Sequence, residues 1–139
     1  MAREVFVDTS GLYALADRKD LAHEAASKLI TKFYNTKTSL VLTDYVLDET
    51  LTLASVRSGP QAALKVLDLT ETSRFFRMLF IDSERFNAAK FYFRKHADQG
   101  YSFTDCTSFV LMKELRLQAA LTTDSHFHKA GFEALLQTP

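Results

Sequence analysis

The chain has 139 residues, of which 47% are hydrophobic, and its 17 Lys and Arg balance its 17 Asp and Glu. This length and composition suit one compact domain with a proper core, and the zero net charge argues against a charged disordered tail or strong unspecific nucleic-acid binding. The single cysteine, Cys106, excludes an internal disulfide and a cysteine-based metal site, and its apolar helical context predicts a small buried side chain.

No run in the sequence approaches the ~18 apolar residues of a membrane span, and the first residues lack the apolar segment of a signal peptide. The sequence also contains no repeats or low-complexity tracts. We therefore expect a cytoplasmic protein with no membrane partner, folded as a single domain over residues 1–139.

Strand-like and helical patterns alternate along the chain. The opening run, Glu4–Asp8, has three consecutive apolar residues, so both of its faces are apolar, as in a central parallel strand between helix layers. Asp20 is placed to cap a helix with apolar residues at helical spacing. In chain order the sequence predicts a strand at 4–8, helices at 11–16 and through 22–33, a strand at 40–43, helices at 44–57 and 62–69, a strand at 75–81, helices at 83–96 and 104–115, a strand at 119–123, a helical turn after Asp124 and a strand at 132–137.

This alternation predicts the fold class. A parallel neighbour needs a crossover connection, normally a right-handed helix, so we expect an α/β protein with a three-layer α/β/α sandwich around a mainly parallel sheet of about four to five strands. In such sheets the ligand crevice lies beyond the carboxyl ends of the strands. Asp8 and Asp124 each follow an apolar strand-like run, so we expect both to face that crevice.

Two further acids lie on helices. At about 100° per residue, Glu49 falls between Leu53 and Val56 inside the apolar arc of its helix, whereas Asp48 points to the polar side. Asp105 lies in the first turn of its helix, in line with apolar residues one and two turns later. A buried carboxylate must be protonated, hydrogen-bonded or bound to a cation, which makes both acids candidates for a functional site.

Each acid also has a purely structural explanation. Asp8 and Asp124 precede predicted helices, where they would act as N-caps, and Asp105 would interact favourably with the helix dipole. Thr9 and Ser10 are able to cap the first helix instead, which frees Asp8 for another role.

The convergence of the acids is the stronger argument. Four carboxylates in one pocket would repel each other and raise each other's pKa values unless cations were present. Ligation by oxygen alone selects Mg²⁺ or Mn²⁺ over zinc. Once a metal neutralises these four acids, 17 basic residues face 13 other acids, a surplus of four that leaves a mildly basic RNA-binding face possible.

Other polar residues give weaker signals. His126 and His128 are two positions apart and diverge on a helix, so we interpret them as surface residues or phosphate contacts rather than metal ligands. Lys90 and Arg94 lie one helical turn apart and could contact an RNA backbone, although a solvated helix face explains them too. The aromatic residues 91–93 between them are expected in the core.

Four segments, taken in order, resemble a PIN domain, and within that family the VapC-type toxins. They are VFVDTSGLYAL at the start, DYVLDETLTL around Glu49, SFTDCTSFVLM around Asp105 and LTTDSHFHKAGF around Asp124. The resemblance covers essentially the whole chain. It implies a PIN-like α/β/α sandwich and a Mg²⁺- or Mn²⁺-dependent endoribonuclease acting on tRNA, rRNA or mRNA, usually a homodimer and often held inactive by a small antitoxin protein.

The resemblance also implies roles for particular residues. Carried over by motif, Asp8, Glu49, Asp105 and Asp124 become the catalytic and metal-binding acids. Ser10 and Thr104 match the small hydroxyl positions beside the acids, which are expected to orient ligands or water. The reaction would be in-line attack of water on an RNA phosphodiester, giving 5′-phosphate and 3′-hydroxyl ends.

Alternative functions remain to be distinguished. A haloacid dehalogenase-type phosphatase needs a second acid where this chain has Ser10, and a phospho-receiver domain needs acids before Asp8 and a later strand-end lysine. A stand-alone PIN nuclease in RNA processing, a DNA nuclease, or an RNA- or protein-binding module with a structural metal site are the other candidates. For the binding module, the helical hairpin around Gly59 and Pro60 would offer an apolar surface.

Overall fold

A computed structural model describes residues 3–137 of the chain. Its strands are β1 Arg3–Val7, β2 Thr38–Thr43, β3 Phe76–Leu79, β4 Ala119–Leu121 and β5 Glu133–Ala134. Its helices are α1 Thr9–Ala16, α2 His23–Asn35, α3 Asp44–Ser58, α4 Pro60–Thr72, α5 Ser83–Lys95, the short 3-10 helix η1 Ala97–Gln99, α6 Phe103–Glu114 and α7 Ser125–Lys129.

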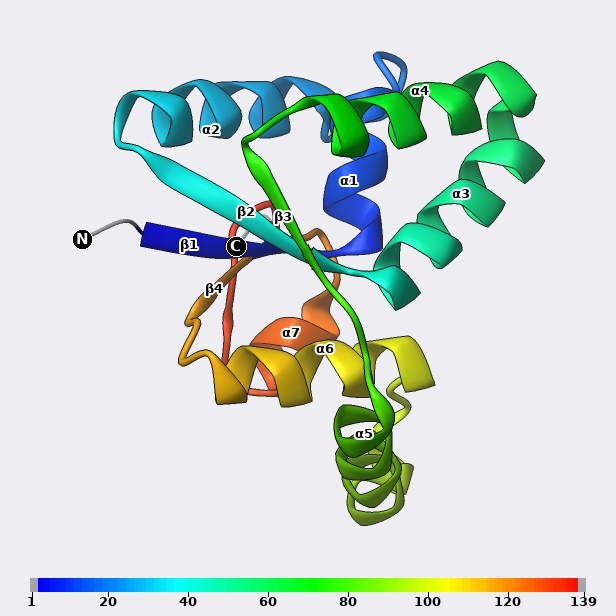
Figure 1. Cartoon of the computed structure of the whole chain (residues 1–139), viewed down its shortest axis with the longest axis vertical. Coiled ribbons are helices and arrows are strands. Elements are labelled where there is room, and N and C mark those ends of the chain that lie inside the picture. Colours follow the sequence, from blue (N-terminus) through cyan, green and yellow to red (C-terminus); the bar gives the residue numbers. More distant parts are fainter. Residues whose placement is uncertain (1–2, 138–139) are drawn as a thin grey trace.

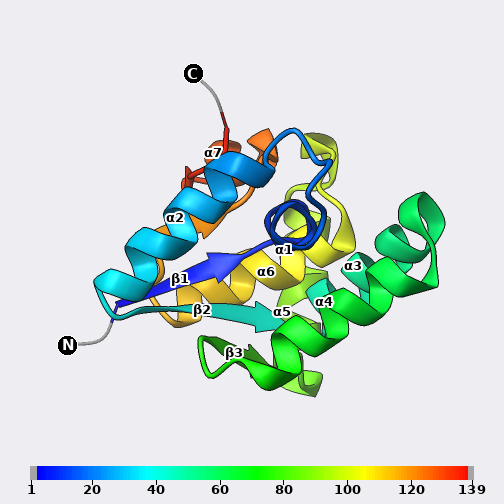
Figure 2. The ribbon, with the colours of Figure 1, turned by 90° about the horizontal axis from the view of Figure 1, so that it is seen from above.

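The strands form one five-stranded sheet in the order β3-β2-β1-β4-β5, and every pairing is parallel. Helices α1, α2 and α4 lie on one side of this sheet and α6 and α7 on the other, while α5 packs against α6 (Figure 1). Figure 2 shows β1 and β2 side by side and running in the same direction. The predicted α/β class and three-layer sandwich are therefore confirmed.

The strand order places a switch point beside β1. From β1 the chain moves one way to form β2 and β3, and then returns to form β4 and β5 on the other side of β1. Val7 at the end of β1 is paired with Leu121 at the end of β4. The connections from these two strand ends leave toward opposite faces of the sheet, which opens a crevice between them.

The core explains why β1 lies at the centre. Phe6 and Val7 are fully buried, with one side chain directed to each helix layer. The Phe6 ring stacks on Phe127 with ring centroids 6.3 Å apart, and Phe109 contacts Phe127 edge to face at 4.9 Å. Cys106 is completely buried, as its context predicts, and burial raises the pKa of its thiol to about 11.

Gly11 allows α1 to approach β4 closely. A Cβ atom at this position would collide with the backbone carbonyl oxygen of Leu121. Only the absence of a side chain lets the first turn of α1 pack against the end of β4. The glycine thus holds the two segments that carry Asp8 and Thr122 at their observed separation.

The edge strands are shorter than predicted. β3 covers 76–79 rather than 75–81, and β5 covers only 133–134 of the predicted 132–137. β4, which lies between β1 and β5 and is not an edge strand, also ends early, at Leu121 instead of Thr123. Apolar runs at an edge pair on one side only, so hydrophobicity overestimates the length of the regular ladder. Phe80, just after β3, is 62% exposed.

Some helix faces also differ from the predicted ones. In α2 the buried alanine is Ala26 rather than Ala25, and the N-cap is Ala22, although Asp20 still accepts a hydrogen bond of 3.0 Å from the Ala22 amide. In α5 Phe91 is 71% exposed and Phe93 is 41% exposed, so the expected place of these two residues in the core is wrong, whereas Tyr92 is half-buried. The predicted hairpin of α3 and α4 is present (Figure 1).

None of the helices within residues 3–137 combines the length and the apolar character that a membrane crossing requires. One contiguous cluster of buried side chains draws on all the major elements of this range. The single domain over residues 1–139 stays a prediction, and its first two and last two residues lie outside the described part of the chain.

Candidate active site

All four predicted acids line one cleft of about 420 Å³ at the carboxyl ends of the central strands. The cleft lies at the switch point between β1 and β4. Its lining residues are Asp8, Thr9, Ser10, Tyr13, Asp20, Glu49, Leu53, Arg57, Gly100, Ser102, Asp105, Thr123, Asp124 and His126. Carboxylates separated by up to 116 residues in sequence therefore meet at one site, and for Asp8 and Asp124 this is the place that the strand-end argument predicts.

Asp8 is the most deeply buried acid of the cleft. Its side chain follows β1 directly, its residue is 4% exposed, and its backbone amide donates to the Leu121 carbonyl over 3.2 Å. Burial raises the pKa of this carboxyl to about 7, with a smaller contribution from the charges of Asp105 and Asp124, while the hydrogen bond from Thr122 opposes the rise. Asp8 occupies the N-cap position of α1 but its side chain makes no capping bond.

Two hydroxyl groups, those of Ser10 and Thr122, fix the Asp8 carboxylate and its surroundings. Thr122 Oγ1 donates to Asp8 Oδ2 over 2.9 Å, and Ser10 Oγ lies within 3.4 Å of the same oxygen. Ser10 Oγ also accepts from the Thr123 amide over 3.0 Å, and Thr122 Oγ1 accepts from the Asp124 amide over 3.0 Å. The loop after β4 is thereby tied to the end of β1.

Glu49 projects from α3 into the cleft rather than into the core. It accepts a short hydrogen bond of 2.6 Å from Thr9 Oγ1, and it shares its helix face with Leu53 and Arg57, one and two turns later. Asp48 is exposed, as predicted, but Val56 is 81% exposed, so the assumed apolar arc was misplaced. The prediction that Glu49 faces inward is correct only in the sense that it faces the site.

Asp105 sits at the third position of α6 and forms a reciprocal capping box with Ser102. Its backbone amide donates to Ser102 Oγ over 3.0 Å, and its Oδ2 accepts from the Ser102 amide over 3.2 Å. The residue is 6% exposed. Burial, and then the charge of Asp124, raise the pKa of this carboxyl above its ordinary value.

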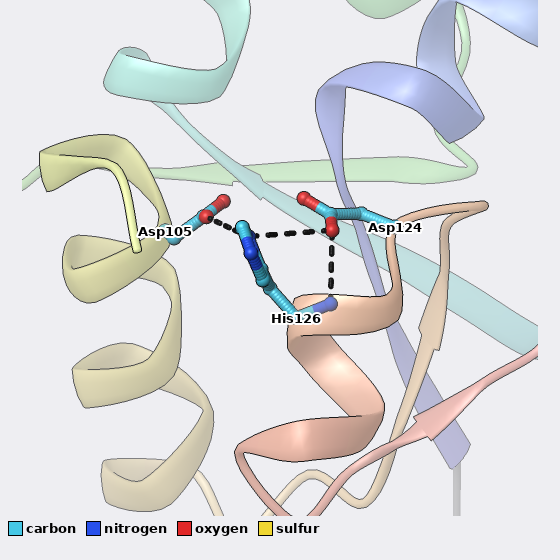
Figure 3. Close-up of side chains that lie close together, drawn as sticks. All are labelled: Asp105, Asp124 and His126. Carbon is cyan, nitrogen blue, oxygen red and sulfur yellow. Dashed lines mark hydrogen bonds and ion pairs between the residues drawn. The ribbon is translucent and has the colours of Figure 1, made fainter. Parts of the chain in front are cut away.

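Asp124 combines both of the roles that the sequence offered. Its Oδ1 caps α7 by accepting from the His126 amide over 2.9 Å, so the structural explanation is correct. Figure 3 shows its other oxygen turned toward Asp105 across the cleft. A carboxylate has enough lone pairs to cap a helix and to bind a cation at the same time.

His126 belongs to the same group of side chains. Its Nδ1 lies 3.3 Å from Asp105 Oδ2 and 3.5 Å from Asp124 Oδ1 (Figure 3). The predicted divergence from His128 is present, since His128 is exposed. The interpretation of His126 as a surface residue is wrong, because the short helix α7 turns this first-turn side chain toward α6 and into the cleft. The alternative interpretation of His126 as a phosphate contact stays a prediction.

The remaining predicted residues fall into two groups. Ser10 lies beside Asp8. The structure does not bring the Thr104 side chain to the cleft, and the backbone carbonyl of Thr104 accepts from Ser108. The hydroxyl that contacts Asp105 belongs to Ser102. Lys90 and Arg94 are exposed on α5 and do not line the cleft, and Lys90 lies 5.3 Å from the Phe86 ring centroid.

Sequence reasoning missed the hydroxyls of Thr9, Thr122 and Ser102. The available signal was their position, because each stands within three residues of a predicted acid. Hydroxyls next to strand-end acids are suited to donate to a carboxylate and hold its orientation.

The donors of the cleft fit a divalent cation. One oxygen each from Asp105 and Asp124 and a nitrogen of His126 lie within 4.8 Å of one another. The buried Asp8 carboxyl has a pKa raised to about 7, so its ionised form is disfavoured unless a positive charge accompanies it. Oxygen donors with a water-accessible opening suit a metal that retains some of its waters.

Comparisons with known proteins agree with this geometry. The 23S rRNA-specific endonuclease VapC20 of Mycobacterium tuberculosis is 33% identical over 129 residues, covering 92% of this chain and 95% of the relative. A VapC ribonuclease of Archaeoglobus fulgidus is 29% identical over 123 residues, covering 87% and 77%.

Solved structures extend the comparison. The crystal structure of VapC20 superimposes with a TM-score of 0.82 at 30% identity, covering 92% of this chain and 95% of that one. A VapBC2 structure from Rickettsia felis matches with a TM-score of 0.65 at 10% identity, covering 94% and 96%, which shows a shared fold. The PIN domain model matches residues 5–133, and the chain belongs to the PIN domain family.

Proposed function

We propose that this protein is a metal-dependent endoribonuclease, the toxin of a toxin–antitoxin pair, with Mg²⁺ or Mn²⁺ as its cofactor. The observation that carries the proposal is the convergence of Asp8, Glu49, Asp105 and Asp124 on one cleft. The similarity to VapC20 and to the Archaeoglobus VapC ribonuclease supports the reaction class.

The chain's own residues would divide the work as follows. The carboxylates of Asp8, Asp105, Asp124 and Glu49 would hold the cation, while Thr122 and Thr9 keep two of these carboxylates oriented through hydrogen bonds of 2.9 and 2.6 Å. When bound, the ion polarises the phosphodiester, activates water near neutral pH and stabilises the leaving oxygen. Arg57, on the same face of α3 as Glu49, is positioned at the cleft to attract the RNA backbone.

A structured ribosomal RNA is the first substrate to test. VapC20 is described as specific for 23S rRNA and as cleaving the sarcin-ricin loop. We propose the same class of target here, because the identity extends over 92% of this chain. Specificity for a folded RNA loop depends on the shape of the surface around the cleft.

Two protein partners complete the proposal. The neighbour from Rickettsia felis is a VapBC2 assembly, which supports a small antitoxin as the inhibitor of this chain. We also propose a homodimer. Co-expression with the product of the adjacent reading frame should restore growth to cells in which this protein arrests it.

The central experiment compares cleavage of total tRNA and rRNA by four proteins, each with Mg²⁺, Mn²⁺ or EDTA. These are the wild type, Asp8→Asn, Glu49→Gln and Asp48→Asn. The last is a matched control, since Asp48 adjoins Glu49 but points to solvent. We expect metal-dependent cleavage by the wild type and Asp48→Asn only, with folding of all four verified by circular dichroism.

Other outcomes identify the competing functions. If Asp8→Asn cleaved RNA at the wild-type rate, the proposed role of the carboxylate site would be rejected. RNA or partner binding that survives the substitution, with no cleavage by any protein, would indicate a binding module. Cleavage of DNA, supplied as a separate substrate, in place of RNA would identify a DNA nuclease.

A further inference from the structure

We propose that His126 is a metal ligand through Nδ1, so that the cleft holds a mixed oxygen and nitrogen site that prefers a first-row transition metal such as Mn²⁺ over Mg²⁺. This inference rests on the proposed metal-dependent function and deepens it. The four carboxylates by themselves would favour a hard cation with oxygen ligands. A nitrogen donor among them changes which ion fits best.

The distances are those of adjacent ligands around one ion. Donors at about 2.1 Å from a metal and at right angles to each other stand about 3.0 Å apart. Nδ1 of His126 is 3.3 Å from Asp105 Oδ2 and 3.5 Å from Asp124 Oδ1. A small movement of the three side chains toward one another would allow all of them to coordinate one cation.

The imidazole is held in this position by the core. Its ring meets Tyr101 edge to face, with centroids 5.4 Å apart, and Tyr101 in turn meets Phe109 at 5.0 Å. Tyr101 is 8% exposed and Phe109 is fully buried. The His126 amide is also bound to Asp124 Oδ1, so both the backbone and the ring are fixed before any ion binds.

The position is specific to His126. His128 lies on the same five-residue helix, but its side chain is exposed and belongs to no candidate ligand group within residues 3–137. Asp105 and Asp124 come from different elements, α6 and the start of α7, yet both direct an oxygen at the same imidazole nitrogen (Figure 3). His128 therefore provides a matched control for any effect of losing an imidazole.

A competing role is that His126 only donates a hydrogen bond to Asp105 and orients it. Both roles predict weaker metal binding after substitution, so affinity alone does not separate them. They differ in one respect. A metal ligand places a nitrogen nucleus in direct contact with the ion, whereas an orienting residue leaves oxygen atoms alone around it.

The test uses Mn²⁺ as both ligand and spectroscopic probe. Metal-free wild type, His126→Ala and His128→Ala are titrated with Mn²⁺ while electron paramagnetic resonance measures the free ion, with and without competing Mg²⁺. Pulsed measurements on the loaded proteins then detect coupling of Mn²⁺ to a directly bound ¹⁴N nucleus. No RNA and no cleavage enter the measurement.

We expect ¹⁴N coupling in the wild type and in His128→Ala, and its loss in His126→Ala. The Mn²⁺ affinity of His126→Ala should fall on the order of tenfold or more, while its Mg²⁺ affinity changes less, because only the transition metal gains from a nitrogen donor. Mn²⁺ binding without ¹⁴N coupling in the wild type would overturn the ligand role and leave the nuclease proposal standing. Wild type that binds no Mn²⁺ would overturn both.

Discussion

At Asp8, burial and ionisation oppose each other. The carboxyl follows the central strand, is 4% exposed and has a pKa raised to about 7 by its burial. In an ordinary core an apolar residue would fill this place at no electrostatic cost. The sequence keeps an acid there, together with a threonine hydroxyl at 2.9 Å that favours its ionised form. Such a costly arrangement is typical of a functional site.

The stability of the metal-free protein should therefore depend on pH through Asp8. The pKa of the Asp8 carboxyl is about 7 in the folded protein, against an ordinary value of 3.8. Its contribution to the free energy of unfolding is therefore fully present below pH 3.8 and is lost as the pH rises through about 7. The difference between the two pKa values corresponds to a loss on the order of 4 kcal/mol in the free energy of unfolding. In EDTA, Asp8→Asn should be more stable than the wild type at about pH 8, with a smaller difference at about pH 5.

Urea unfolding at both pH values measures this difference. Asp48→Asn serves as the control, because its exposed side chain should give no such pH-dependent gap. If the stability difference between the wild type and Asp8→Asn were equal at the two pH values, the burial argument for Asp8 would be wrong.

Thr122 should act through the acids that it orients. Its hydroxyl donates to Asp8 and accepts from the Asp124 amide, and its side chain is completely buried. Thr122→Val keeps the shape but removes both bonds, so we expect kcat/KM for RNA to fall about tenfold to a hundredfold. Thr122→Ser keeps the hydroxyl and should retain most activity, whereas equal losses in the two variants would assign Thr122 a packing role only.

At the scale of elements, the site is built by contacts between segments that are distant in sequence. β1 and β4 present their ends side by side, and α1 can start against β4 only because Gly11 has no side chain. α3 packs against α1 and contributes Glu49, which accepts a hydrogen bond from Thr9. The placement of these elements, more than any local motif, sets the separation of the acids.

Gly11→Ala tests this close approach. The added Cβ would collide with the Leu121 carbonyl, so the helix or the strand must shift, and we expect a loss of about 1–3 kcal/mol in the free energy of unfolding. Thr52→Ala, at an exposed position of α3, gains helix propensity without a collision and should be neutral or slightly stabilising. Denaturant titration measures the free energy of unfolding of both variants. An unchanged free energy of unfolding for Gly11→Ala would contradict the close approach of α1 to β4.

Over the whole molecule, the expected homodimer needs an apolar surface. Phe91 is 71% exposed and Phe93 is 41% exposed, and both lie on α5, the outer helix beneath α6 (Figure 1). Large aromatic side chains left in solvent on one helix are typical of a protein interface. They offer a physical reason for the sequence to place phenylalanine where the core does not require it.

Phe91→Ser should therefore shift a dimer toward monomer while leaving the free energy of unfolding of the monomer nearly unchanged. Sedimentation velocity over a range of concentrations measures the shift. Leu21→Ser, at a fully exposed position in the connection between α1 and α2, is the control and should remain dimeric. If the dimer of Leu21→Ser dissociated and that of Phe91→Ser did not, the interface would lie away from α5.

Part of this protein was determined by its sequence alone. Apolar runs alternating with helical patterns predicted a parallel α/β sandwich, because crossovers between parallel strands require helices. Acids directly after buried strands predicted a common crevice, since parallel strands end at the same edge of a sheet. This strand-end argument identifies Asp8 and Asp124, whereas Glu49 and Asp105 are predicted from their positions on helices and from the resemblance to PIN domains.

The tertiary structure decided which neighbours complete that cleft. His126 meets Asp105 only because α7 packs against α6, and Ser102 rather than Thr104 supports Asp105 because the capping box selects the residue before the helix. Likewise, Val56 and Phe91 proved exposed because an apolar stripe is buried only where another element covers it. Spacing along the chain fixes the direction of a side chain on its own element, but contact depends on how separate elements pack together.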